Sequence, residues 1–183
     1  ESSYHNSSID NIVHQWHSIE QAFQLMETSG KELGVQYTRV GMFRSDVMYL
    51  KPIDIAMLDK GIYDTENKHA VVAGFARFPV NDRMIYGNVE GVRIWATERF
   101  RLIEIRAQSV EARGFTMHSE QFLNDQVFGE IKSAGIAIDV NHDICFVRTR
   151  ADESAIISDC QLGGFVRGWK KDKSRDLVAS IVG

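Results

Sequence analysis

Apolar side chains recur at helical spacing near the start of the chain. Their steps of four and three residues place them on one stripe of a helix: Ile12, Trp16, Ile19, Phe23 and Met26. Asp10 or Asn11 can cap the start of this helix, and Gly30 and Gly34 can end it. The pattern therefore predicts a long amphipathic helix that lies against a sheet.

Two further stretches show the same spacing. Residues 89–106 carry Val92, Trp95 and Phe100 on one face, which predicts an amphipathic helix. A third helix is predicted from Ser119, as its amino-terminal cap, to residue 134, with Gly135 as its stop.

Short apolar runs between these helices predict strands. They occur at residues 40–43, 70–75, 84–86, 136–140 and 144–147. The first run is expected to be buried on both faces, and the last two form either a hairpin or two edge strands. A short helical turn is predicted at residues 53–58, and a turn at Gly87-Asn88. The alternation of helices and strands predicts an α/β fold with a mixed, mainly parallel sheet flanked by helices.

Composition is consistent with one soluble domain. The chain has 183 residues, of which 44% are hydrophobic, enough to bury a core. We expect a loose amino end (residues 1–9), an α/β core (10–160), and a Gly-rich, basic tail (161–183). With 21 basic and 25 acidic side chains, the net charge of −4 argues against a nucleic-acid partner. No apolar run approaches the roughly 20 residues that a membrane span requires.

The polar residues that follow the first strand are the first candidates for chemistry. Arg44 and Asp46 come directly after the apolar run at 40–43, shortly before Pro52. In α/β sheets, ligands bind at the carboxyl ends of the strands. We therefore expect Arg44 and Asp46 to lie at a binding site.

A set of short motifs follows in order over roughly residues 12–160 and carries a resemblance. The motifs are Trp16 to Ile19, Tyr37, Arg44-Ser45-Asp46-Val47, Pro52, Val80-Asn81-Asp82-Arg83, Tyr86-Gly87, Ser119-Glu120-Gln121-Phe122-Leu123, Phe146-Val147-Arg148-Thr149-Arg150 and Asp159-Cys160. In this order they resemble a poorly characterised group of glycosyltransferase-like proteins of the GT-A type. The resemblance implies a nucleotide-sugar donor and a glycan or other hydroxyl acceptor as partners. It also implies that the half that holds the nucleotide base would precede Glu1, so the chain is expected to be a processed form or a segment of a longer protein.

The resemblance assigns roles to individual residues. Asp46 would hold a divalent cation, Mn²⁺ or Mg²⁺, that bridges the donor phosphates. The family motif has two carboxylates here, whereas this chain has Arg44 in place of the first, which could itself hold a phosphate. Alternatively, Arg44 and Asp46 pair with the loop backbone and with Arg83.

The remaining candidates come from three later segments. Asn81, Asp82 and Arg83 would contact the sugar or the acceptor, or else Asn81 and Asp82 serve only a turn. Glu120 would be the general base, kept charged by the helix amino terminus, or else it serves the helix alone. Arg148 and Arg150 would contact a phosphate or an acidic acceptor; otherwise they bridge to neighbouring acids: Asp152, Glu153 and Asp159.

Two functions therefore remain open. The first is a glycosyltransferase, or its acceptor-side part, with Asp82 and Glu120 as catalytic residues. The second is a non-catalytic module on a degenerate glycosyltransferase fold that binds a glycan or a protein. The two cysteines, Cys145 and Cys160, leave the compartment open, because they are either unpaired or joined by the bridge that the resemblance implies. Both a secretory lumen and the cytoplasm are compatible with this sequence.

Overall fold

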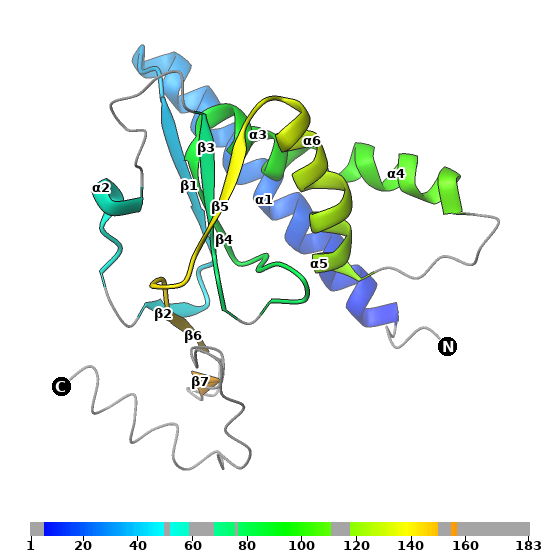
Figure 1. Cartoon of the computed structure of the whole chain (residues 1–183). Helices are drawn as coiled ribbons and strands as arrows, with labels where there is room; N and C mark the ends of the chain where they lie inside the picture. The colour runs from blue at the N-terminus through cyan, green and yellow to red at the C-terminus, as the bar shows by residue number, and fades with distance from the viewer. Residues whose placement is uncertain are drawn as a thin grey trace.

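The computed structural model of the chain describes residues 6–49, 52–58, 68–75, 77–110, 118–149 and 155–156. It shows an α/β fold in which a mixed four-stranded sheet carries a helical layer on one face and a small second sheet near its other face (Figure 1). The predicted tail (161–183) lies outside the described residues.

The first helix, α1 (Asn6–Leu33), is the long amphipathic helix that the spacing predicts. Trp16 and Phe23 on its apolar stripe are buried in the core. The helix ends at Gly34, whose φ of 66° is the left-handed conformation common after a helix. It begins at Asn6, so the expected cap at Asp10 or Asn11 was wrong, whereas most of the expected loose end (residues 1–9) lies outside the described residues.

The main sheet has the strand order β1-β4-β3-β5. Its strands are β1 (Arg39–Phe43), β3 (His69–Ala73), β4 (Met84–Asn88) and β5 (Ala137–Asn141). Strand β4 is antiparallel to both β1 and β3, and only β3 and β5 are parallel. The prediction of a mainly parallel sheet was therefore wrong, because the ten residues between β3 and β4 are too few for a helical crossover.

This pairing brings four segments to one edge of the main sheet. Strands β1, β3 and β5 point the same way, and β4 points the opposite way. The carboxyl ends of the first three therefore meet the amino end of β4. Strand β1 lies at the side of the sheet, with Phe43 45% exposed, so it is not buried on both faces as expected.

A second sheet is made of β2 (Val47–Tyr49), β6 (Phe146–Thr149) and β7 (Ala155–Ile156), all antiparallel. Strands β5 and β6 belong to different sheets, so the hairpin alternative was wrong; β5 is an edge strand as the other alternative expects, but β6 lies between β2 and β7. The side chain of Asn141 accepts hydrogen bonds from the amides of Asp143 and Ile144, which turns the chain out of the main sheet. The short helix α2 (Ile55–Leu58) matches the predicted helical turn.

The helix predicted over 89–106 is two helices, α3 (Val89–Thr97) and α4 (Arg99–Val110). Strand β4 runs on to Asn88, which caps α3 by accepting a hydrogen bond from the amide of Glu90, so the predicted turn at Gly87-Asn88 was wrong. At the break, the side-chain Nε of Arg99 donates to the carbonyl of Trp95, the acceptor that a continuous helix would give to the Arg99 amide.

The last helical segment consists of α5 (Ser119–Phe122), a π-helical turn (Leu123–Val127) and α6 (Phe128–Ser133). The capping position is occupied by His118 and not by Ser119, with no side-chain capping bond. Gly135 ends the segment as predicted, with a φ of 75°.

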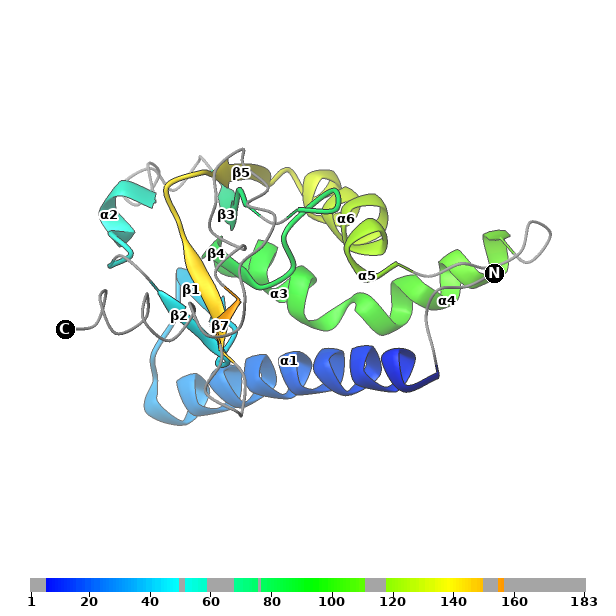
Figure 2. The ribbon, with the colours of Figure 1, turned by 90° about the horizontal axis from the view of Figure 1, so that it is seen from below.

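The described residues form two apolar cores, one on each face of the main sheet. The larger joins the sheet to α1, α3, α4 and the α5–α6 segment, and Figure 2 shows α1 running alongside α3 and α4. The smaller lies between the two sheets, where Phe75 and Phe146 pack edge to face. Because both faces are covered, polar groups of the sheet are accessible mainly at its ends.

Candidate functional site

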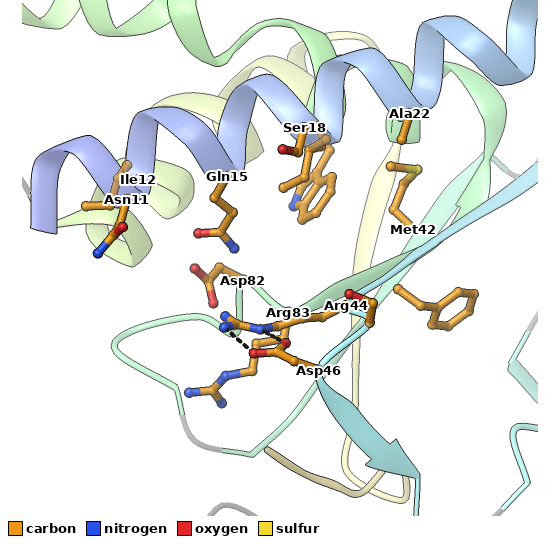
Figure 3. Close-up of a pocket in the computed structure, with 14 residues that line it drawn as sticks. Asn11, Ile12, Gln15, Ser18, Ala22, Met42, Arg44, Asp46, Asp82 and Arg83 are labelled. Atoms are coloured by element: carbon orange, nitrogen blue, oxygen red, sulfur yellow. Dashed lines mark hydrogen bonds and ion pairs between the residues drawn. The ribbon is translucent and has the colours of Figure 1, made fainter. Parts of the chain in front are cut away.

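A cavity of about 590 Å³ opens where β1 ends. Its walls come from α1, from the residues that follow β1, from the residues that precede β4, and from Trp95 of α3. We call it the strand-end cavity. Figure 3 shows Arg44, Asp46, Asp82 and Arg83 gathered on one side of it, across from α1.

Arg44 and Asp46 form a bidentate ion pair in the cavity wall. The Arg44 Nε and Nη2 atoms each donate to one carboxylate oxygen of Asp46, with a distance of 2.8 Å for the Nη2 bond. The backbone amide of Arg44 also donates to the carbonyl of Arg83, which fixes the segment after β1 against the start of β4. Both side chains are about one-third exposed, at 31% and 39%. Of the alternative arrangement, a bond to Arg83 is present through the Arg44 backbone amide, whereas the pairing of the Arg44 and Asp46 side chains with each other was not predicted.

This arrangement does not fit the expected divalent cation. Both oxygens of Asp46 accept hydrogen bonds from one guanidinium, which takes the place of a metal beside the carboxylate. Among the residues that the structure describes, no three His, Cys, Asp or Glu side chains lie close enough together to hold a metal ion. The Mn²⁺ or Mg²⁺ stays a prediction of the resemblance.

The residues that precede β4 divide into two roles. Asn81 is fully buried, its amide donates to the carbonyl of Phe75, and its oxygen accepts from the backbone amide of Arg83. The expected contact of Asn81 with a sugar is therefore not supported, and its side chain serves the turn. Asp82 and Arg83 do line the cavity.

Glu120 lies near Asp82 at the start of α5. Burial, together with the nearby carboxylate of Asp82, raises the pKa of Glu120 to about 7, although Arg83 and Arg148 act in the opposite direction. Desolvation is the largest influence on this pKa and opposes the expected effect of the helix terminus, which by itself would keep the carboxyl charged at neutral pH. Glu120 can instead gain or lose a proton near neutral pH. It does not itself line the strand-end cavity.

The carboxyl-terminal candidates are only partly described. Arg148 of β6 pairs in register with Val47 of β2, and its charge acts on Glu120. Arg150 and the acids 152, 153 and 159 lie outside the described residues. Cys145 is disulfide-bonded, and Cys160, the other cysteine of the sequence, also lies outside them.

The α1 wall of the cavity was not predicted from the sequence. Asn11, Gln15 and Ser18 face the cavity, and Figure 3 shows Gln15 pointing from α1 toward Asp82. Their spacing of four and three residues was visible in the sequence as a second, polar stripe of the helix. Polar stripes usually face water, so only the position of α1 over the end of β1 distinguishes this one.

Replacement of Glu120 by glutamine is expected to flatten the pH dependence of stability. Because folding raises this carboxyl pKa from 4.5 to about 7, the unfolded chain loses the proton first, and stability falls as pH rises through this window. For a half-buried group we expect about 1 kcal/mol, after allowance for solvent screening. Melting temperatures of both proteins between about pH 4.5 and pH 8 would measure this. An identical decline in both proteins would contradict the shifted pKa.

Comparison of the chain with protein-family models, with curated proteins and with solved structures found no match. The roles proposed below therefore rest on the sequence resemblance and on the geometry of the site. Of the helices in the described part of the chain, none combines the length and the apolar character that crossing a membrane requires.

Proposed function

We propose that this chain is a glycosyltransferase-like domain that binds a nucleotide-sugar donor and transfers the sugar to a hydroxyl acceptor. The observation that supports this most is the strand-end cavity, where Arg44, Asp82 and Arg83 come together from motifs far apart in the sequence. The volume of about 590 Å³ is in the range of small-molecule sites. The order of the sequence motifs supports the same proposal.

In this proposal the two arginines stabilise the leaving diphosphate. A guanidinium can hold a phosphate through two parallel hydrogen bonds, and Arg44 and Arg83 both line the cavity. Arg44 would exchange one or both of its bonds to Asp46 for bonds to phosphate. Asp82 would accept hydrogen bonds from sugar hydroxyl groups.

Glu120 would take the proton. The acceptor oxygen forms a bond to the anomeric carbon, the bond from that carbon to the phosphate oxygen breaks, and the nucleoside diphosphate leaves with the electron pair. The acceptor proton passes to the Glu120 carboxylate, whose pKa of about 7 is close to the optimum for a general base at neutral pH. The path of the proton from an acceptor to Glu120 would run beside Asp82.

The second candidate, a non-catalytic module that binds a glycan, is favoured by a different observation. The side chains of Arg44 and Asp46 already bond to each other through two hydrogen bonds, and the Asn81 amide donates to the backbone carbonyl of Phe75. A cavity with neutral polar groups on α1 could still bind carbohydrate without a donor phosphate.

Thermal unfolding with nucleotide sugars tests the proposal. UDP- and GDP-sugars at about ten times Kd, with and without Mn²⁺, are expected to raise the melting temperature by about 3–6 °C, since they bind only the native state. Arg44→Met should abolish the shift. Arg101→Met is the matched control, because Arg101 is an exposed arginine of α4 that does not line the cavity and pairs with Glu98 and Glu130.

The same assay separates the two candidates. If donors shift the melting temperature and release of the nucleoside diphosphate is lost in Glu120→Gln while binding remains, transfer is supported. If free oligosaccharides shift it and no nucleotide sugar does, the chain is a binding module. No shift with either ligand class would contradict both candidates.

A further inference from the structure

Arg99 is a buried cation next to the strand-end cavity. Its side chain is in the core, only 3% exposed. Its Nε donates to the carbonyl of Trp95 at 2.9 Å, and its guanidinium carbon lies 4.1 Å from the centroid of the Trp95 ring and 5.9 Å from that of Trp16. Two aromatic rings and a hydrogen bond thus hold the charge in one place.

The guanidinium is not fully compensated by these contacts. Its Nη2 atom is buried and has no hydrogen-bond partner among the described residues. Although burial lowers the pKa of Arg99 to about 10, the group is charged at neutral pH. A buried charge is costly unless an opposite charge lies near it. Asp82 is the acid whose charge acts on Arg99.

Trp95 connects this cation to the site. Trp95 lines the strand-end cavity together with Asp82, and the Arg99 guanidinium lies over its ring. Arg99 itself does not line the cavity. A fixed positive charge therefore lies against the cavity wall, near an acid that faces the cavity.

We propose that Arg99 is a positioning residue whose fixed charge, held between Trp16 and Trp95, keeps the Asp82 carboxylate in place at the wall of the strand-end cavity. Through Asp82 it would orient the group that accepts ligand hydroxyls, without touching the ligand. That role in sugar binding rests on the proposed function, whereas the coupling of the two charges does not.

A double-mutant cycle measures the coupling without any ligand. In the wild-type background, Asp82→Asn leaves Arg99 without the charge of Asp82 and should raise the unfolding equilibrium constant in urea by about tenfold or more. In the Arg99→Met background, Asp82→Asn should raise the unfolding equilibrium constant by less than about threefold. Asp139→Asn, an exposed acid of β5, is the matched control and should have no effect in either background. An equal cost of Asp82→Asn in both backgrounds would overturn the proposal, because Arg99 would then be only a packing residue.

A second measurement avoids any change at Arg99, in case Arg99→Met does not fold. The Arg99 Nε–H group, bonded to the Trp95 carbonyl, should give a slowly exchanging side-chain NMR signal. Asp82→Asn should shift this signal, and Asp139→Asn should leave it unchanged. A signal unmoved by Asp82→Asn would overturn the proposal. Neither experiment contains a nucleotide sugar, so failure here is distinct from failure of the proposed function.

Discussion

Replacing Gly87 by alanine is expected to destabilise the fold by more than about 3 kcal/mol. Gly87 lies in β4, between Val40 of β1 and Ala70 of β3, with a φ of 152° that L side chains rarely adopt. A Cβ atom there would meet the carbonyl oxygen of His69 within the sheet. Neither the backbone conformation nor the neighbouring strand can accommodate it without a shift of the central strands.

Gly129→Ala is the matched control for Gly87→Ala. Gly129 lies in α6, and an added Cβ atom would have nothing within 4 Å. Alanine is the better helix former, so this change should stabilise the protein by about 0.5–1 kcal/mol. Urea unfolding of both variants would measure the two effects. A stability of Gly87→Ala within about 1 kcal/mol of wild type would contradict the close approach of β3 and β4.

Phe23→Ala should cost about 3–5 kcal/mol, because it removes a fully buried side chain and leaves a cavity. Phe23 is 0% exposed and belongs to the core between α1 and the main sheet. This helix also forms one wall of the strand-end cavity. Loss of Phe23 would therefore weaken the attachment of that wall.

Leu25→Ala, two residues further along the same helix, is the control for Phe23→Ala. Leu25 is 68% exposed, so its removal should change stability by less than about 0.5 kcal/mol. Urea or thermal unfolding of the two variants would compare them. Equal effects would mean that α1 does not pack on the sheet through the stripe that contains Phe23.

Part of the candidate site could be predicted from the sequence. Arg44 and Asp46 were expected at a site because they follow a strand, and Asp82 and Arg83 because of the family resemblance; all four line the strand-end cavity. Asn81 was expected beside them, but its side chain is turned inward, since the turn after Pro79 needs its two polar ends. The presence of polar residues in a turn does not reveal which side chain hydrogen-bonds to the backbone and which one faces a cavity.

Charge partners were not predictable from the sequence in the same way. Glu120 was expected to be charged from its place at a helix start, whereas its pKa is raised by burial and by Asp82, which is 38 residues earlier in the chain. The sequence does not indicate that Arg99 is buried, since an arginine at helical spacing normally faces water. Desolvation depends on which residues cover a group, and that is a property of the assembled chain.

Local pattern alone determined where most elements lie: the long first helix, the fully buried β3, and the helix that stops at Gly135. The periodicity of helices and strands is a local property, so it can be read from the sequence without knowing which segments pack together. The tertiary structure decided the strand directions, the division into two sheets and the break at Arg99. It also decided which polar side chains share one cavity, because packing between segments distant in sequence sets their burial and their neighbouring charges.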